Sequence, residues 1–379
     1  MEFQLNDEQK LIQKTARDFA VNELAPGAVE RDEKKIWPRE GISQMADLGF
    51  MGMMTDPQYN GGGMDTISYA LAMEEISRVD ASAAVVMSVN NSLVCYLLEK
   101  FGSQFIKEKY LSQLATGKKI GAFSLSEPQS GSDASNMRTI AKREGENYLL
   151  TGTKNWVTNG INSDFVIVFA ITEKGEGHKG ISCFLVEKGL DGFEVGKPEN
   201  KLGIRASDTS ELYFDNVKVP VENLIGSEGE GFKIALATLD GGRIGIASQA
   251  LGIAQASLDA SISYSKERIQ FGKPIAVNQE IQFKIADMAM EIEASRLLIH
   301  KAAWMKDKKQ NYGHVASMAK VYASEAAMRA STQCVQIHGG FGFMRESGIE
   351  RLMRDAKITQ IYEGTSEIQR VVIARALLK

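Results

Sequence analysis

The sequence predicts a mostly α-helical protein with a central β domain, and three observations lead to this prediction. The chain has 35 glycines but only 7 prolines in 379 residues, and scarce proline permits long helices. Residues 1–120 and 231–379 carry apolar side chains at helical spacing. Residues 121–230 instead hold short β-branched and aromatic segments separated by turn residues. We therefore expect an N-terminal α-helical domain, a middle antiparallel β-barrel or sandwich and a C-terminal four-helix bundle over these three ranges.

The N-terminal domain is expected to consist of buried helices. The first helix should begin after Asn6, because Gln9 three residues later completes a capping-box pattern, and it should end at residues 25–27 (Ala-Pro-Gly). Residues 66–100 are rich in Ala, Met, Val and Leu and predict further buried helices. Within them the pair Asn90-Asn91 needs hydrogen-bond partners if it is buried.

The middle domain is predicted from four strand-like segments, at 147–158, 164–172, 181–187 and 210–219. Residues 165–171 are apolar throughout, which predicts a strand buried on both faces. The segment Gly175–Gly180 matches the GxGxxG pattern, but a dinucleotide site requires a helix after the glycines. A strand-like segment follows here, so we interpret these glycines as a hairpin loop.

The C-terminal domain contains four long helical candidates, at 243–267, 278–307, 314–337 and 366–378. In the second of them, apolar residues follow the 4-3-4-7 spacing of a bundle seam. These residues are Ile281, Ile285, Met288, Ile292 and Ile299.

Composition excludes several classes of function. With 44 basic and 48 acidic residues the formal charge is −4, so no electrostatic signature of nucleic-acid binding exists. Three dispersed cysteines form no CxxC pair and four histidines show no ligand spacing, so no metal site is expected. The first residues lack a signal-peptide pattern, and no run of 18 apolar residues predicts a membrane span. We therefore expect a cytoplasmic protein.

Two stretches in the β region are candidates for a cofactor surface. Residues 123–133 combine small hydroxyls with free backbone N–H groups, which can hold a pyrophosphate or the polar edge of a flavin; the alternative is a domain linker. In residues 154–160, Trp156 and Thr158 point to the same side of a regular strand and could present an aromatic face and a hydroxyl to a ring. The alternative for Trp156 is a core tryptophan.

Two further stretches lie in the helical region. In residues 239–245 and 268–274, glycines at an expected helix start together with Arg243 and Arg268 favour phosphates; the alternative is surface arginines paired with acids. In residues 336–342 the glycines predict a helix C-cap. Glu363 lies among apolar residues before a glycine, where burial would raise the pKa of its carboxyl and make it a base. The alternative is an ordinary turn glutamate before a helix.

Taken together and in this order, the stretches resemble the acyl-CoA dehydrogenase family, most closely its short-chain (butyryl-CoA) members. The resemblance covers essentially the whole chain. It is strongest in SEPQSGSDAS (126–135), NWVTNG (155–160), TLDGGRIGIASQALGIAQ (238–255), RIQFGKP (268–274) and RDAKITQIYEGTSEIQR (354–370). It implies the three-domain fold described above, a noncovalent FAD and a homotetramer built as a dimer of dimers.

The resemblance also implies the site residues. The positions that match FAD contacts are Phe123, Leu125, Ser126, Gly131, Ser132, Trp156, Thr158, Arg268, Phe271, Gln279, Gln336, Gly339, Gly340, Thr365 and Glu367. Those from Arg268 to Gly340 match contacts that the family makes partly across its dimer. The positions that match acyl-CoA contacts are Ser132, Asp240, Arg243, Tyr362 and Gly364.

Glu363 matches the catalytic base of the family. The implied reaction removes the α proton of an acyl-CoA thioester with Glu363 while the β hydrogen passes as hydride to flavin N5, which yields a trans-2-enoyl-CoA. The N–H of the base residue and a flavin ribityl hydroxyl polarise the carbonyl, and electrons pass to an electron-transfer flavoprotein. Some members place the base near position 242, but this chain has Gly242 there.

Two alternative functions follow from the same residues. A branched short-chain substrate, such as isobutyryl- or 2-methylbutyryl-CoA, would need only a differently shaped pocket. A non-enzymatic helical assembly protein would account for the long helices but not for Glu363 and Trp156.

Overall fold

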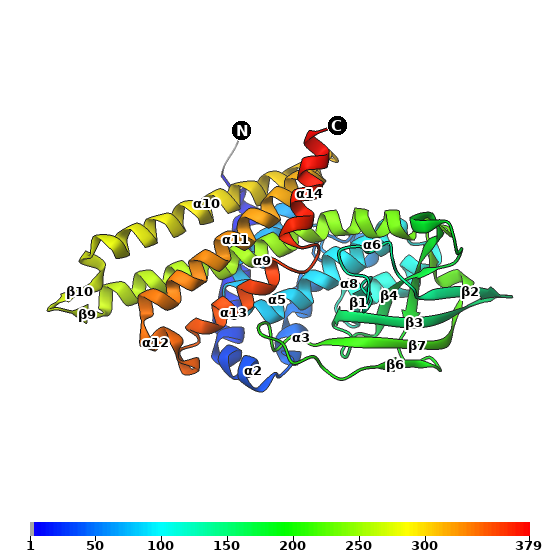
Figure 1. The fold of residues 1–379 in the computed structure, drawn as a ribbon, viewed down its shortest axis with the longest axis horizontal. Helices are drawn as coiled ribbons and strands as arrows, with labels where there is room; N and C mark the ends of the chain where they lie inside the picture. Colours follow the sequence, from blue (N-terminus) through cyan, green and yellow to red (C-terminus); the bar gives the residue numbers. More distant parts are fainter. Residues whose placement is uncertain (1–3) are drawn as a thin grey trace.

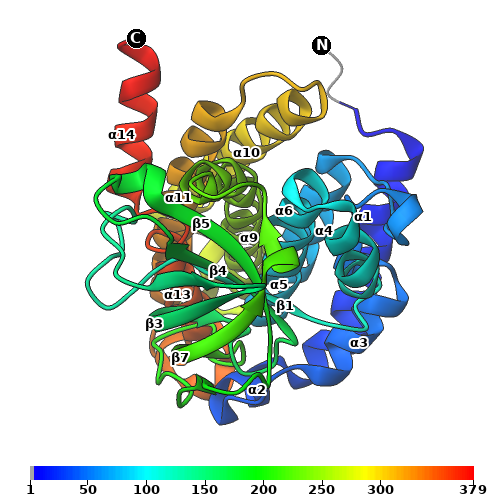
Figure 2. The ribbon, with the colours of Figure 1, turned by 90° about the vertical axis from the view of Figure 1, so that its right-hand side faces the viewer.

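The computed structural model describes residues 4–379 and confirms a mostly helical protein with a central sheet (Figure 1). Helices occupy the chain up to Ala115, strands lie between Gly121 and Ile225, and helices return from Gly231. In Figure 1 the bundle forms one end of an elongated molecule and the sheet forms the other. Figure 2, a view along the molecule, shows the N-terminal helices beside the sheet.

The N-terminal helices begin as expected at a capping box, in which Asn6 Oδ1 accepts from Gln9 N at 2.8 Å and Gln9 Oε1 accepts from Asn6 N at 3.1 Å. The α-helix ends earlier than expected, because a π-helical and a 3-10 turn replace its last residues. The elements are α1 (Asp7–Phe19), η1 (Ala20–Leu24), η2 (Ala25–Gly27), α2 (Ala28–Lys34), α3 (Arg39–Asp47), η3 (Phe50–Gly52), η4 (Pro57–Tyr59), α4 (Thr66–Ser77), α5 (Ala81–Ser88), η5 (Val89–Cys95), α6 (Tyr96–Phe101), α7 (Gln104–Ile106), η6 (Lys107–Leu111) and α8 (Ser112–Ala115).

Helices α5 and α6 are joined by the π-helical segment η5 into one continuous run. The run Ala81–Phe101 is long and apolar enough to cross a membrane by composition, but 94% of its most apolar window is buried in the protein. Its two asparagines find the partners that burial demands. Asn90 donates to Met51 O and Leu114 O, and Asn91 donates to Phe50 O and Met87 O.

The strands form one eight-stranded sheet of order β6-β7-β3-β2-β4-β5-β8, with β1 also beside β4. The strands are β1 (Gly121–Ser124), β2 (Ile140–Glu144), β3 (Asn147–Thr158), β4 (Phe165–Ile171), β5 (Ile181–Glu187), β6 (Phe193–Val195), β7 (Thr209–Pro220) and β8 (Leu224–Ile225). Strand β4 is buried on both faces as expected, and Gly175–Gly180 joins β4 to the antiparallel β5 as a loop, with no helix after its glycines.

The expectation of a purely antiparallel sheet is wrong, because β1 and β2 both run parallel to β4. Parallel neighbours need a long connection. The excursion at 125–139 and the β2–β3 hairpin supply it between β1 and β4. The sheet is therefore mixed.

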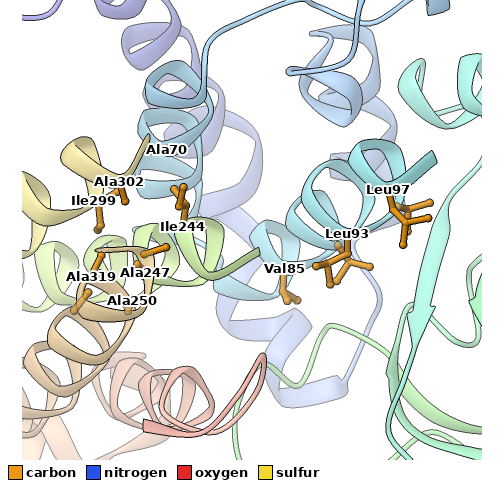
Figure 3. Close-up of a cluster of buried hydrophobic side chains, with 14 of the residues drawn as sticks. Ala70, Val85, Leu93, Leu97, Ile244, Ala247, Ala250, Ile299, Ala302 and Ala319 are labelled. Carbon is orange, nitrogen blue, oxygen red and sulfur yellow. The ribbon is translucent and has the colours of Figure 1, made fainter. Parts of the chain in front are cut away.

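The C-terminal elements are α9 (Gly231–Glu267), α10 (Gln279–Asp307), α11 (Gly313–His338), α12 (Gly340–Phe343), α13 (Ile349–Thr359) and α14 (Ser366–Leu377), with the hairpin β9 (Ile269–Gln270) and β10 (Lys273–Pro274) between α9 and α10. The seam on α10 is confirmed, with Met288, Ile292 and Ile299 buried and Ile281 and Ile285 partly buried. Alanines on α9, α10 and α11 let these helices pack closely, together with Leu93 of η5 in the same core (Figure 3).

Helix α9 begins at Gly231, twelve residues before the expected start, so Gly241 and Gly242 lie in its middle. The expectation of a helix start there is wrong. A glycine inside a helix costs roughly 1 kcal/mol relative to alanine, and Gly242 shows why it is present. A Cβ at Gly242 would lie 2.1 Å from Glu363 Oε2.

Candidate active site

Glu363 lies in the turn between α13 and α14, in a backbone conformation that non-glycine residues seldom adopt. Its φ is +52°, and the φ of Gly364 is +93°. Such a strained residue persists only where its surroundings hold it. Here Gln369 Nε2 donates to both Glu363 O and Gly364 O at 3.0 Å, and Lys320 Nζ donates to Gly364 O at 2.8 Å.

The carboxylate of Glu363 points inward, although the residue as a whole is half-buried. Its Oε2 is buried and has no hydrogen-bond partner in the described part of the chain. Burial raises the pKa of Glu363 to about 7, while the positive charges of Lys320 and Arg243 oppose the rise. A carboxylate that titrates near neutral pH suits a general base. An ordinary turn glutamate would face solvent, so this arrangement favours the base.

Three elements enclose this carboxylate besides its own turn. Gly242 of α9 leaves the space that the carboxylate occupies, and Leu93 of η5 lies 2.8 Å from the position of a Cβ at Gly242. On α4, Tyr69 donates its hydroxyl to Ser88 Oγ at 3.1 Å, next to Gly245. These elements present glycine, leucine and tyrosine surfaces around the site, while Lys320 and Arg243 add positive charge near the carboxyl.

Segment η5 connects this enclosure to the first cofactor stretch. Its Leu93 faces α9, while the adjacent Val94 contacts Gly121 at the start of β1. Asn90 of the same segment accepts from Gly121 N at 3.0 Å. Strand β1 then leads directly into residues 123–133, so one π-helical turn fixes the base region relative to that stretch.

The two cofactor stretches of the β region lie side by side, because Asn155 N donates to Ser126 O at 2.9 Å. Beneath them, Lys154 and Glu127 form a buried ion pair at 2.8 Å. Glu127 also accepts from the N–H groups of Arg138 and Thr139. Burial alone would raise the pKa of Glu127, but Lys154 and these N–H groups outweigh it and lower it to about 2. The loop 127–139 is thus fastened at both ends.

Trp156 is not a core tryptophan. Its side chain is 62% exposed, and its φ is +60°. The residue lies in a β-bulge of β3, because the register with β7 shifts between Lys154 and Val157. The expected regular alternation of Trp156 with Thr158 is therefore wrong. The bulge turns a large aromatic ring toward solvent beside the half-buried Thr158, which is how a bulge re-aims a side chain.

In the first cofactor stretch, residues 123–133, burial decreases along the chain. Phe123 is half-buried and its ring lies 5.1 Å from that of Phe169. Leu125 is buried and Ser126 is half-buried, while Gly131 and Ser132 are exposed on the loop. The stretch therefore offers both an anchored strand and an accessible, hydroxyl-bearing loop.

A second group of predicted cofactor residues lies elsewhere on the chain. Arg268, Phe271 and Gln279 are exposed around the β9–β10 hairpin, at the tip of the bundle opposite the sheet (Figure 1). Phe271 has a φ of +52° in this hairpin. A single chain therefore does not bring this group to the strip around Trp156.

The end of α11 lies near the same tip. Gln336, Gly339 and Gly340 are exposed, and Gly339 ends the helix with a φ of +60°, as a C-cap does. Tyr264 of α9 stacks on His338 at 4.3 Å, close to the cap. A Cβ added to Gly339 or Gly340 would have no atom within 4 Å, so the backbone of both glycines is open to a ligand.

Arg243 is neither a surface arginine nor part of a helix-start anion site. It is 5% exposed in the middle of α9, where it pairs with Asp240 at 2.5 Å and donates to Ser317 Oγ at 3.3 Å. Its Nε is buried without a partner in the described chain. Near the turn, Tyr362 is half-buried and hydrogen-bonds Gln249.

The other two predicted FAD contacts lie at the start of α14. Thr365 is its N-cap and accepts from Ile368 N at 3.3 Å. Glu367 is exposed in the first turn. Both lie within four residues of Glu363.

Sequence reasoning missed Lys320 and Gln369, which hold the Glu363–Gly364 turn in place, and Tyr69 and Leu93, which line its surroundings. The one available signal was Lys320, a charged residue in the otherwise small and apolar segment 315–323. The other three depend on contacts between distant segments, which a single sequence does not reveal.

Comparison with known proteins supports one family. Three sequence profiles match, those of the acyl-CoA dehydrogenase N-terminal domain at residues 6–118, middle domain at 122–217 and C-terminal domain at 229–378. The chain is 49% identical over 383 residues to the short-chain specific acyl-CoA dehydrogenase of Megasphaera elsdenii, and the match covers all of both chains.

Solved structures agree. The structure of butyryl-CoA dehydrogenase from Megasphaera elsdenii matches with a TM-score of 0.98 at 49% identity, and covers 100% of both chains. A chain in a structure described as the electron transferring flavoprotein of Acidaminococcus fermentans matches with a TM-score of 0.99 at 48% identity, again over 100% of both. The chain therefore belongs to the acyl-CoA dehydrogenase family of FAD-dependent oxidoreductases.

Proposed function

We propose that this protein oxidises a short-chain acyl-CoA to the trans-2-enoyl-CoA, with Glu363 as the base that removes the α proton. The observation that carries the proposal is the enclosed Glu363 Oε2, which is buried, unpartnered within the described chain and titrates near neutral pH. The similarity to a short-chain specific enzyme and to a butyryl-CoA dehydrogenase supports the choice of substrate.

The residues present fit FAD. The exposed ring of Trp156 stands beside the hydroxyl-bearing loop that follows Ser126, and this pairing suits a flat ring with a polar edge. We propose that Phe123, Leu125, Ser126, Gly131, Ser132, Trp156, Thr158, Thr365 and Glu367 of one chain hold the cofactor. When bound, FAD accepts the β hydrogen as hydride.

The chain's own groups account for the proton chemistry. Glu363 takes the α proton, and the burial of its Oε2 keeps the carboxyl basic because it is poorly hydrated. The Glu363 N–H has no protein acceptor in the described part of the chain, so it is free to donate to the thioester carbonyl and stabilise the developing enolate. We propose that Ser132, Asp240, Arg243, Tyr362 and Gly364 bind the substrate around it.

A second copy of the chain is proposed to complete the cofactor site. Arg268, Phe271, Gln279, Gln336, Gly339 and Gly340 lie exposed away from Trp156, so they would reach FAD bound to a partner. Helix α10 supports further assembly, because it exposes an apolar stripe at seven-residue spacing. The stripe consists of Phe283, Met290, Leu297 and Trp304. We propose a homotetramer, with domains at 1–120, 121–230 and 231–379.

We propose that an electron-transfer flavoprotein receives the electrons. The support is the similarity to a chain in the electron transferring flavoprotein structure of Acidaminococcus fermentans. We also place the protein in the cytoplasm, where its three cysteines, all free and buried, would stay reduced.

Rates over a panel of acyl-CoA substrates test the proposed substrate. We expect kcat/KM to be highest for butyryl-CoA and to fall for octanoyl-CoA and for isobutyryl-CoA. A preference for isobutyryl- or 2-methylbutyryl-CoA would favour the branched-chain alternative. The enzyme, once reduced by butyryl-CoA, should pass its electrons to a purified electron-transfer flavoprotein. If an active enzyme fails to reduce that protein, the proposed acceptor is contradicted.

A further inference from the structure

A buried lysine, Lys320 on α11, contacts the turn that carries Glu363, and the mechanism above does not use it. Its side chain is 0% exposed, and its Nζ donates to Gly364 O at 2.8 Å. An ammonium has three N–H donors, and this carbonyl is its one hydrogen-bond acceptor in the described chain. Burying a cation with so little compensation is costly, so packing alone does not explain its presence.

The charged and titratable groups around this turn come from several elements. They are Arg243 and its ion-pair partner Asp240 from α9, Glu367 from α14, Tyr69 from α4, Asp355 from α13 and Tyr362 from the turn itself. Burial raises the pKa of both tyrosines, so they remain neutral at physiological pH.

The two cations near Glu363 differ in their own pairing. Arg243 is already paired with Asp240 at 2.5 Å. Lys320 has no carboxylate within ion-pair distance in the described chain, yet it lowers the pKa of Glu363 more than any other charged group does. Lys320 is thus the cation whose charge remains available to the Glu363 carboxylate.

We propose that Lys320 is a positioning residue for the base: its hydrogen bond fixes the Glu363–Gly364 turn, and its buried charge favours the ionised carboxylate. This inference rests on the proposed function, because Glu363 is the proposed base. The hydrogen bond acts on the backbone next to the strained φ of Glu363. The charge limits how far apolar burial can shift the carboxyl toward its neutral form.

The direction of the pH effect follows from the charges. Burial lowers the pKa of Lys320, and the negative charge of Glu363 raises it again. The pKa of Lys320 is lowered to about 7, close to that of Glu363, so Lys320 is protonated up to the pH at which the Glu363 carboxyl begins to lose its proton. Without this cation the carboxyl would lose its proton only at higher pH. An opposite charge at close range shifts a pKa by about one unit or more.

The test is the pH profile of flavin bleaching by butyryl-CoA, measured by anaerobic stopped flow between about pH 5.5 and 9. We expect Lys320→Met to move the acid limb up by about one pH unit, and Lys320→Arg, which keeps the charge, to return it toward the wild-type position. The matched control is Lys154→Met, which removes another lysine of 0% exposure beside Glu127. Normalised to the flavin it retains, Lys154→Met should show an acid limb at the wild-type pH.

An acid limb that stays in place in Lys320→Met, while the rate merely falls, would overturn the inference and leave Lys320 a structural residue. The same conclusion follows if Lys320→Arg behaves as Lys320→Met does. If Lys320→Met does not fold, Lys320→Gln takes its place under the same criterion, since it also lacks the charge. A wild-type protein whose flavin is not bleached by any acyl-CoA would instead contradict the proposed function, so the two failures are distinguishable.

Discussion

Replacement of Gly242 by alanine should separate the stability of the fold from the position of the Glu363 carboxylate. The added Cβ would lie 2.1 Å from Glu363 Oε2 and 2.8 Å from Leu93 Cδ2. Contacts of a Cβ begin at about 3.0 Å, so the carboxylate must withdraw by roughly 1 Å, and a misplacement of that size can cost about 10²-fold in rate. We expect kcat with butyryl-CoA to fall by about two orders of magnitude.

The stability of the same variant should change little. Alanine stabilises the middle of α9 by about 0.5–1 kcal/mol relative to glycine, whereas crowding in a core costs about 1–3 kcal/mol. The crowded atoms are the carboxylate of Glu363 and a methyl group of Leu93, both at the ends of side chains, so we expect the crowding cost to be at the low end of this range. The free energy of unfolding should therefore stay within about 1 kcal/mol of wild type, as measured by urea denaturation.

Gly241→Ala is the matched control. A Cβ at Gly241 meets no atom nearer than Tyr312 Oη at 3.7 Å, so this variant gains helix stability without displacing the carboxylate. Its melting temperature should rise and its kcat should fall far less than that of Gly242→Ala. A Gly242→Ala enzyme with wild-type kcat, or equal losses in both variants, would refute the packing of Glu363 against Gly242.

Three further predictions concern other parts of the molecule. Lys154→Met leaves the Glu127 carboxylate without its cation, so the free energy of unfolding in urea should fall by about 3–5 kcal/mol; a change under about 1 kcal/mol would contradict the buried pair. Because the pKa of Glu127 is lowered to about 2 from 4.5, its ionised form stabilises the protein above pH 4.5 and this contribution is lost as the pH falls through 2. The stability difference between wild type and Glu127→Gln should therefore shrink over that range, and a constant difference would argue against the lowered pKa. Leu297→Glu, in the exposed stripe of α10, should yield smaller species in sedimentation velocity, whereas Lys218→Glu, at an exposed position on β7 away from the stripe, should not; unchanged sedimentation of Leu297→Glu would remove the stripe from the interface.

Local sequence patterns predict the structure correctly where interactions within one element determine it. The Asn6–Gln9 capping box, the buried strand β4 and the seam on α10 all rest on spacing within one element, and the structure confirms each. Periodicity also located the long helices, because few prolines interrupt them.

The sequence-based predictions are wrong where contacts between distant segments determine the local structure. Gly241 and Gly242 looked like a helix start because glycine disfavours helix interiors, but α9 continues through them since the carboxylate of Glu363 occupies the space beside Gly242. Trp156 looked like a member of a regular strand, but pairing with β7 creates a bulge there. The parallel placement of β1 and β2 likewise depends on sheet assembly rather than on either strand.

At Glu363 the local sequence predicts part of the structure, and contacts with distant segments determine the rest. The apolar neighbours of Glu363 in sequence indicated a carboxylate of raised pKa, yet a turn glutamate matched the spacing equally well. The enclosure is formed by Gly242, Leu93 and Lys320, which lie between 43 and 270 residues away in the sequence. Only the folded chain distinguishes the two interpretations.

The visible absorption spectrum of the purified protein under anaerobic titration with butyryl-CoA tests the central claim most directly. The account predicts a yellow protein whose flavin absorbance bleaches with substrate, and a Glu363→Gln variant that retains the flavin and binds butyryl-CoA but does not bleach. Bleaching of Glu363→Gln at the wild-type rate would contradict the assignment of Glu363 as the base.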